Sequence, residues 1–186
     1  MIVYGYTNYH ATAPTCLVIG NFDGVHVGHQ RLIQEAIHAS QQFNGKTVAL
    51  TFDPHPLQFL DPQNSPALLT TLKRRAELLI QYGIDAVIIQ PFDRAFADLS
   101  AEDFIQALFT QLYVQHVCIG PNIRFGRHRE GHIAHLESLG RIHGYTTQIV
   151  PITHLDREPI SSSRIREALR AGNHSLVSRL IDRDCL

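Results

Sequence analysis

Cysteine is scarce in this chain, and both a long apolar run and an excess of one charge are missing. The three cysteines, Cys16, Cys118 and Cys185, form no CxxC pair, which is the spacing typical of zinc sites and redox dithiols. No apolar run approaches the roughly 20 residues that span a membrane, and no signal segment opens the chain. The formal net charge of −1 gives no bias toward nucleic acid or acidic membranes. We therefore predict a cytoplasmic protein that binds neither nucleic acid nor a membrane.

Apolar side chains and histidines are plentiful. The 186 residues are 44% hydrophobic, which is enough for one domain with a sizeable core. Cys16 and Cys118 stand in apolar runs, so we expect buried thiols there. The 12 histidines are scattered along the chain, and a histidine-based metal protein stays open as an alternative.

Apolar, β-branched runs alternate with helical patterns along the whole chain. Strands are predicted at 2–4, 16–19, 46–52, 85–90, 115–120 and 146–151, and helices at 28–43, 72–82, 100–112, 133–143, 161–171 and 175–181. This order predicts an α/β fold, a Rossmann-like doubly wound parallel sheet of about five strands with helices on both faces. The basic run 73–75 is predicted to be a solvated helix face.

Four unusual polar segments follow predicted strands or open a helix near the same sheet edge. They are residues 21–29, 53–56, 121–129 and 161–166. Ligands of open α/β sheets bind beyond the carboxyl ends of the strands. We therefore expect the four segments to converge on one site.

The first segment has the form of a strand, a glycine-containing turn and a helix N-terminus. Such a junction offers unpaired backbone N–H groups and the positive end of a helix dipole, which suit a phosphate. His26 and His29 flank Gly28, and their three-residue spacing places both imidazoles on one face. Gly28 has no side chain, so a phosphate could approach the backbone between them.

The block GNFDGVHVGHQ at 20–30 resembles the HxGH motif of the nucleotidylyltransferase superfamily. It is most similar to the FMN adenylyltransferase (FAD synthetase) module of bacterial bifunctional riboflavin kinase/FAD synthetases. The resemblance implies catalytic roles for His26 and His29. It also implies that ATP contacts Gly20, Asn21, Phe22, Asp23, Gly24, His26, Gly28 and His29.

The segment TFDPHP at 51–56 is similar to a segment of the same family. The match implies that Asp53, Pro54 and Pro56 bind FMN, with the two prolines seating the flavin ring. A rigid turn after a strand is the structural alternative, because two prolines cannot continue a ladder.

Two later segments complete the resemblance. GPNIRFG at 120–126 is similar to the family's GxNFRFG, which implies that Asn122 contacts the reacting phosphates and that Arg124 holds the FMN phosphate. An isoleucine stands at position 123 in place of the usual phenylalanine. ISSSRIR at 160–166 is similar to ISSTxIR, with Ser163 at the threonine position. By this match Ser162, Ser163 and Arg166 would hold the β- and γ-phosphates.

The family implies a reaction in which ATP and FMN give FAD and pyrophosphate. No acidic cluster indicates a protein metal site, so we expect Mg²⁺ to be held mainly by the nucleotide phosphates. Two alternatives stay open, namely the same fold with another acceptor and a non-catalytic paralogue that binds nucleotide or flavin.

Bifunctional family members continue into a riboflavin kinase barrel. Because the sequence stops at position 186, near the expected junction, we expect one adenylyltransferase domain over 1–186 and no riboflavin kinase domain. A separate riboflavin kinase is then a candidate partner.

Overall fold

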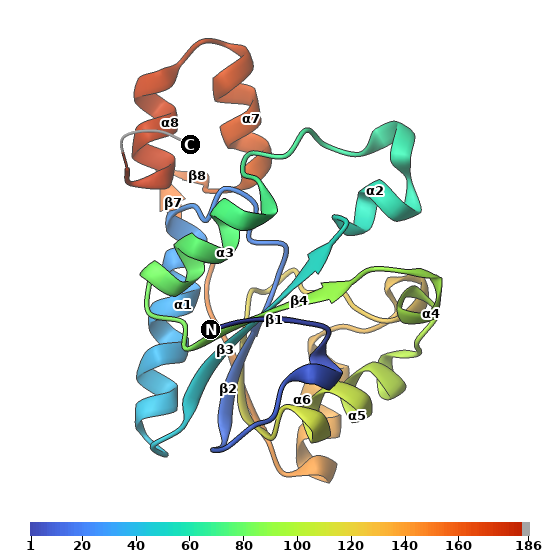
Figure 1. Cartoon of the computed structure of the whole chain (residues 1–186). Helices are drawn as coiled ribbons and strands as arrows, with labels where there is room; N and C mark the ends of the chain where they lie inside the picture. Colours follow the sequence, from blue (N-terminus) through green and yellow to red (C-terminus); the bar gives the residue numbers. More distant parts are fainter. Residues whose placement is uncertain (184–186) are drawn as a thin grey trace.

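The computed structural model describes residues 1–183, and its centre is a parallel sheet (Figure 1). The strands are β1 (Ile2–Tyr4), β2 (Thr15–Ile19), β3 (Lys46–Asp53), β4 (Ala86–Pro91), β5 (Val114–Ile119) and β6 (Thr146–Ile149). They lie in the order β1-β4-β3-β2-β5-β6, and every pairing among them is parallel. The predicted α/β fold is confirmed. The sheet has six strands instead of about five because the short first segment pairs with β4.

Helices cover both faces of the sheet, as Figure 1 shows. On one face lie α1 (Val27–Gln41) and α3 (Leu72–Gln81), and on the other lie α5 (Ala101–Gln111) and α6 (Ile133–His143). Successive residues of a strand point to opposite faces, so Leu17 packs in one core cluster and Val18 in the other. A strand buried on both sides must be apolar throughout, which is why these strands are continuous apolar runs.

The C-terminal helices α7 (Ser162–Arg170) and α8 (His174–Ile181) form a third, smaller apolar cluster. This pair stands at the top of the view in Figure 1, against the start of α1. Val27 at the first position of α1 packs against the cluster. This packing places the serine–arginine segment 160–166, which is near the end of the chain, next to the turn after β2.

Some short elements escaped prediction from the sequence. They are α2 (Pro56–Leu60), α4 (Arg94–Ala97) and the hairpin of β7 (His154–Leu155) with β8 (Glu158–Pro159). Each is too short to show a periodic apolar pattern. Within residues 1–183, no helix is both long and apolar enough to cross a bilayer. Cys16 and Cys118 are buried as predicted, and Cys185 lies outside the described residues.

The strand order reverses direction at β2. From β2 the chain moves to β3 and β4 on one side, whereas β5 and β6 lie on the other side. In a doubly wound sheet the crevice for a ligand lies at this switch point, beyond the carboxyl ends of the two flanking strands. The turn after β2 and the loop after β5 therefore face each other across the crevice.

Arg75 contradicts the prediction that the run 73–75 is a solvated helix face. Lys73 and Arg74 are exposed, but Arg75 is only 2% exposed. Its guanidinium donates to the backbone carbonyls of Asn21, at 2.9 Å, and Phe52, at 3.0 Å. One buried cation thus joins the segments that leave β2 and β3, and burial lowers its pKa. A helical pattern in the sequence predicts which face of the helix a residue occupies. It does not predict which backbone carbonyls of distant segments will lie within hydrogen-bonding distance of that residue.

Replacement of Arg75 by methionine should lower the free energy of unfolding by about 2–3 kcal/mol, because two carbonyls lose a charged donor. Urea denaturation followed by circular dichroism measures this loss. Arg74→Met, on the exposed neighbouring position, is the matched control and should change stability by less than about 0.5 kcal/mol. Equal urea midpoints for the two variants would contradict a stabilising role for the hydrogen bonds that buried Arg75 makes to the two carbonyls.

Candidate active site

The turn after β2 is tightly closed. Phe22 and Val25 have φ angles of 50° and 39°, in the left-handed region that non-glycine residues rarely adopt. The Phe22 ring is fully buried beneath Gly20, where a Cβ would lie 3.3 Å from it. A glycine at position 20 therefore lets the turn fold back on its own phenylalanine. The chain then enters α1 with His26 as the N-cap.

The two histidines of the turn form one stacked pair. Their ring centroids are 3.7 Å apart and the planes differ by 13°. The backbone N–H of His29 donates to Nδ1 of His26 at 3.3 Å, so one imidazole caps the helix that carries the other. A Cβ at Gly28 would lie 3.2 Å from the His26 ring. The absence of a side chain at position 28 thus leaves room for the capping imidazole.

Both imidazoles are neutral at pH 7. Burial lowers the pKa of His26 to about 4. Burial, and then the neighbouring His26, lower the pKa of His29 well below its ordinary value. Because Nδ1 of His26 accepts a hydrogen bond, its hydrogen is on Nε2, which is free to donate. A neutral donor at a helix N-terminus can bind an anion without a buried charge of its own.

Asp23 joins the turn to the C-terminal serine–arginine segment. Its carboxylate is 2% exposed and accepts from the backbone N–H groups of Leu69, at 2.9 Å, and Thr70, at 3.1 Å. The guanidinium of Arg166 donates to the same carboxylate, and the Ser162 hydroxyl donates to the Asp23 backbone carbonyl at 2.8 Å. The segments around positions 26 and 162, far apart in sequence, are therefore in direct contact.

Arg166 is occupied within the protein. Besides Asp23 it donates to the backbone carbonyl of Ala67 at 2.7 Å, and its side chain is 11% exposed. Ser163, one turn earlier on α7, is exposed. A phosphate that reached this corner would meet a free hydroxyl at position 163 and a guanidinium already paired with a carboxylate.

Two neighbouring cavities open at the carboxyl edge of the sheet. The smaller, about 280 Å³, lies against Gly28 and His29. The larger, about 540 Å³, lies over Pro56 and Phe92. The larger volume is within the range of roughly 300–1,000 Å³ that small-molecule sites have, and the smaller is just below it. Both cavities are lined by Ile19, Gly20, Asn122 and Ile123, so they meet where β2 and β5 end.

The predicted site residues divide into three groups. The smaller cavity is lined by Gly20, Phe22, His26, Gly28, His29 and Asn122. The larger cavity is lined by Gly20, Asn21, Pro56, Asn122 and Arg124. Among the described residues, Asp23, Gly24, Asp53, Pro54, Ser162, Ser163 and Arg166 line neither. Of these, Asp53 and Pro54 are exposed at the end of β3 and joined by a cis peptide bond.

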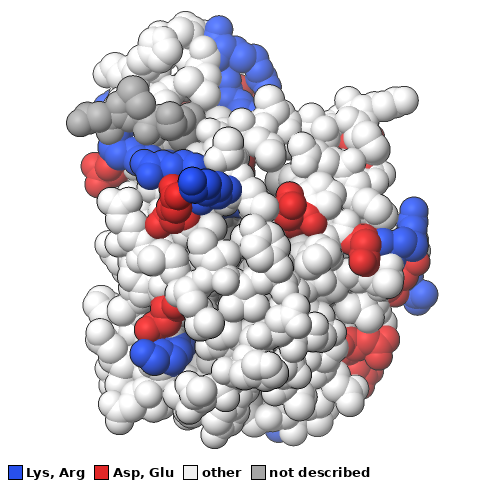
Figure 2. Space-filling view, in the orientation of Figure 1, with Lys and Arg blue, Asp and Glu red and all other residues white. Residues whose placement is uncertain are grey.

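The larger cavity has an aromatic wall and a cationic rim. Phe52, Phe92, Phe96, Phe104 and Phe125 contribute the wall. The rim carries Arg94, Arg124, Arg127 and Arg129, together with Asp98. On the face drawn in Figure 2, charges of both signs stand in small groups, with no continuous patch of one sign. An apolar wall beside several guanidinium groups fits a flat ring that bears an anion.

Sequence reasoning missed two residues of the larger cavity. His55 caps α2, and its Nε2 lies 3.0 Å from the side-chain amide of Asn21, which joins the turns after β2 and β3. Arg94 stands over the Phe59 ring at 5.5 Å from its centroid. Arg94 follows β4 at the same sheet edge. The position of Arg94 soon after a predicted strand is the sequence signal that could have identified it as a site residue. Only the strand order, however, shows that β4 lies beside β3.

The isoleucine at position 123 is accommodated by packing. Ile123 is partly buried against the same core cluster that contains Phe125. The loop continues through Gly126, with φ of 70°, where a Cβ would lie 2.7 Å from the backbone nitrogen of Ala101. The loop thus keeps close contact with the start of α5, and Asn122 is left exposed at the junction of the two cavities.

A family model for FAD synthetase matches residues 9–164, most of the chain. The chain belongs to the FAD synthetase family. The matched range holds the strands β2 to β6 of the sheet, both histidines and the loop after β5. The family resemblance expected from the sequence is therefore confirmed.

Relatives of this FAD synthetase family member carry the name bifunctional riboflavin kinase/FMN adenylyltransferase. The one from Buchnera aphidicola subsp. Schizaphis graminum is 37% identical over 169 residues, which cover 89% of this chain and 54% of the relative. Those from Haemophilus influenzae and Escherichia coli K12 are 34% and 35% identical, and cover 97% and 89% of the chain. The matches span 59% and 53% of those two relatives. The chain thus spans little more than half the length of these relatives.

A solved structure gives an independent check of the fold. A crystal structure described as a macrolide-efflux protein from Streptococcus pneumoniae aligns with a TM-score of 0.86 and 24% identity. The alignment covers 100% of this chain and 62% of that one. At this identity the likeness concerns the fold alone.

The lowered pKa of His26 predicts a loss of stability in acid. Between its folded pKa of about 4 and its ordinary value of 6.5, the unfolded chain binds more protons than the folded one. Stability is therefore full above pH 6.5 and falls as the pH drops through this window, by about 2 kcal/mol from pH 7.5 to 5 for this one group.

Urea denaturation of the wild type and of His26→Asn, at about pH 7.5 and about pH 5, measures this loss of folding stability. Asparagine keeps an N-cap acceptor but does not titrate, so the variant should lose about 2 kcal/mol less on acidification. His38→Asn, on the exposed face of α1, should behave as the wild type. The same pH dependence in His26→Asn and wild type would refute a depressed pKa at His26.

Proposed function

We propose that this chain transfers the adenylyl group of ATP to the phosphate of FMN, forming FAD and releasing pyrophosphate. The observation that supports it best is the stacked neutral pair His26 and His29. The pair opens on a cavity that adjoins a larger aromatic cavity at Asn122. Two small molecules in adjacent cavities meet at their shared wall, where a group can pass between them.

ATP would occupy the smaller cavity, with its phosphates at the N-terminus of α1. The unpaired N–H groups of the first turn and the positive end of the helix dipole favour an anion there. Nε2 of His26 and the ring of His29 would donate to oxygens on the α-phosphorus. Ser162, Ser163 and Arg166 would take the β- and γ-phosphates, which requires Arg166 to turn from Asp23 toward the phosphates.

FMN would occupy the larger cavity. The aromatic wall and Pro56 present flat apolar surface to the flavin ring, and Arg124 on the rim can pair with the FMN phosphate. Asp53 and Pro54 would then shape the loop that precedes Pro56. Asn122, which lines both cavities, stands where the FMN phosphate and the α-phosphorus of ATP would approach each other.

The reaction needs positioning and charge stabilisation more than a covalent protein intermediate. A phosphate oxygen of FMN attacks the α-phosphorus, and the bond from that phosphorus to the oxygen bridging to the β-phosphorus breaks. The two imidazoles and Asn122 would stabilise the charge that develops on the equatorial oxygens. Bound Mg²⁺ would offset the charge of the phosphates.

The magnesium ion would be held mainly by the phosphates themselves. Asp23 is the buried carboxylate of the turn, and it already accepts hydrogen bonds from Leu69, Thr70 and Arg166.

The names of the relatives also include riboflavin kinase, so FMN would come from such a kinase, whether on a continuation of this chain or on a separate protein. We place the reaction in the cytoplasm, where ATP is available.

The proposal is tested by incubating the chain with ATP, Mg²⁺ and FMN and measuring FAD and pyrophosphate after separation of the flavins. His29→Ala should lower kcat/KM about a hundredfold or more, the usual cost of one donor to a transition state. His38→Ala removes an exposed histidine from the same helix and should leave the rate unchanged.

Three results would overturn the proposal. Equal rates for His29→Ala and wild type would reject the role of the imidazole pair. Tight binding of ATP and FMN without pyrophosphate release would favour a non-catalytic paralogue. Pyrophosphate release with nicotinamide mononucleotide or phosphopantetheine, but not with FMN, would assign another acceptor.

A further inference from the structure

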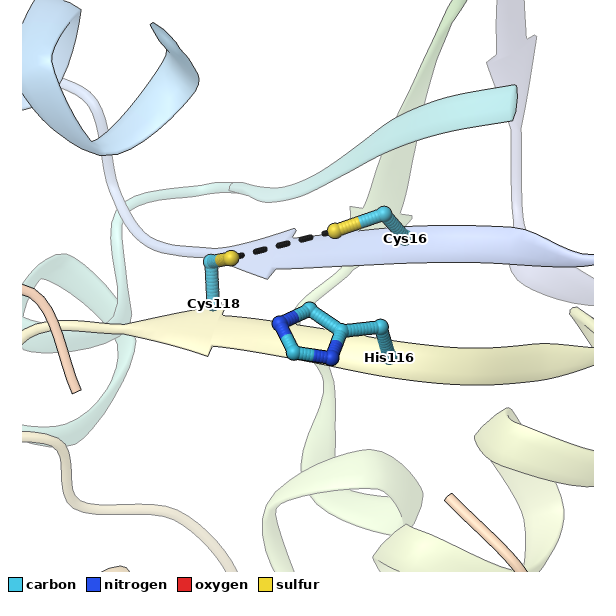
Figure 3. A group of neighbouring side chains, drawn as sticks. All are labelled: Cys16, His116 and Cys118. Atoms are coloured by element: carbon cyan, nitrogen blue, oxygen red, sulfur yellow. Dashed lines mark hydrogen bonds between the residues drawn. The ribbon is translucent and has the colours of Figure 1, made fainter. Parts of the chain in front are cut away.

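Three side chains outside both cavities gather on the α1 face of the sheet. Figure 3 shows Cys16 on β2, and His116 and Cys118 on β5, with the two sulfur atoms turned toward one another. The Sγ atoms are 3.8 Å apart, and one ligand atom from each of the three residues lies within 4.8 Å of the others. Both cysteines are fully buried. Nothing in the proposed adenylyl transfer uses this cluster.

The strand register argues against a disulfide. Cys16 stands opposite His116, whereas Cys118 stands opposite Val18, so the cysteines are diagonal neighbours on adjacent strands. With strands about 4.8 Å apart and about 6.6 Å between residues i and i+2 of a parallel strand, such diagonal neighbours are roughly 8 Å apart at their Cα atoms. Disulfides need a Cα separation below about 6.8 Å. The two sulfurs approach each other at a distance that leaves space for an atom bound to both.

A fourth polar atom lies beside the cluster. Oε1 of Gln148 on β6 lies 3.6 Å from Cys118 Sγ and 3.4 Å from His116 Nε2. Ligands at ordinary zinc bond lengths in a tetrahedron are separated by about 3.8 Å for S and S, about 3.6 Å for S and O and about 3.4 Å for N and O. The three corresponding distances in the protein agree with these values.

The surroundings orient the ligand atoms as metal sites require. Nδ1 of His116 lies 2.6 Å from the Thr146 hydroxyl, which fixes the ring with Nε2 toward the sulfurs. The amide nitrogen of Gln148 donates to Glu35 at 3.1 Å, which fixes the direction of Oε1. The Glu35 side chain is 25% exposed and also pairs with Arg31 at 2.9 Å, so a chain of polar contacts leads from the surface to Gln148.

We propose that Cys16, His116 and Cys118 bind one Zn²⁺, with the Gln148 amide oxygen as fourth ligand. Binding releases the two thiol protons to solvent, and the two thiolates then balance the charge of the ion, which suits a buried apolar location. Four protein ligands leave no open position, so the site is structural. It ties β2, β5 and β6 together and so joins the two strands, β2 and β5, that flank the switch point.

The test uses the full chain carrying Cys185→Ser, so that every sulfur ligand must come from Cys16 or Cys118. Titration with Co²⁺ should give thiolate-to-cobalt charge-transfer absorption and intense tetrahedral visible bands that saturate at about one ion per chain. Zn²⁺ should displace the cobalt and abolish the bands. A further Cys118→Ser change should remove the charge-transfer absorption and the retention of zinc.

A milder variant keeps the test decisive if loss of a cysteine prevents folding. Thr146→Val removes an exposed hydroxyl that contacts His116 Nδ1 and the Gln115 carbonyl but none of the proposed ligand atoms, and it should weaken zinc affinity about 10- to 100-fold. FAD formation reports separately on the proposed function. Folded protein that binds neither Co²⁺ nor Zn²⁺, or equal zinc affinity in wild type and Thr146→Val, would show two buried thiols in simple contact and overturn the proposal.

Discussion

The arrangement of the candidate site depends on the buried carboxylate of Asp23. It accepts hydrogen bonds from two backbone N–H groups of the segment before α3 and pairs with Arg166 on α7. A buried carboxylate needs such partners, because an unpaired charge in the interior costs several kcal/mol. This one group therefore holds three segments together: the turn after β2, the segment before α3 and the start of the C-terminal helices. Without this carboxylate, α7 would keep the hydrogen bond from the Ser162 hydroxyl to the Asp23 backbone carbonyl but would lose the ion pair of Arg166.

The same turn keeps its histidines neutral. His26 is buried, His29 packs edge-on against Phe22, and the two rings stack on each other, so a charged imidazole in this turn would lack the water that stabilises it. Burial thus decides how the pair can act, as hydrogen-bond donors and not as resident cations. The cationic groups of the region are arginines on the rim of the larger cavity and in the corner with Asp23. In the proposed reaction the imidazoles and the guanidinium groups would accordingly stabilise different phosphates.

Most of the fold was predictable because its signals are local. Apolar runs bounded by glycine or proline mark the strands, and the stripe Leu32, Ile33 and Ala36 marks the buried face of α1. The turn residues and the family motifs also placed both histidines and Asn122. Arg75 and His55 were not predictable as ties between loops, because their partners are backbone carbonyls and an amide more than 20 residues away. No local pattern records such a pairing.

The sequence alone determined the alternation of strands and helices, the family and the segments that gather at the carboxyl edge, because each depends on the order of residues along the chain. Only the tertiary structure decided which distant residues meet. It paired Arg166 with Asp23, and it brought Cys16 of β2 beside His116 and Cys118 of β5. The physical reason is strand order and register. The spacing of 102 residues between the two cysteines carries no information until β2 and β5 lie side by side in a defined alignment.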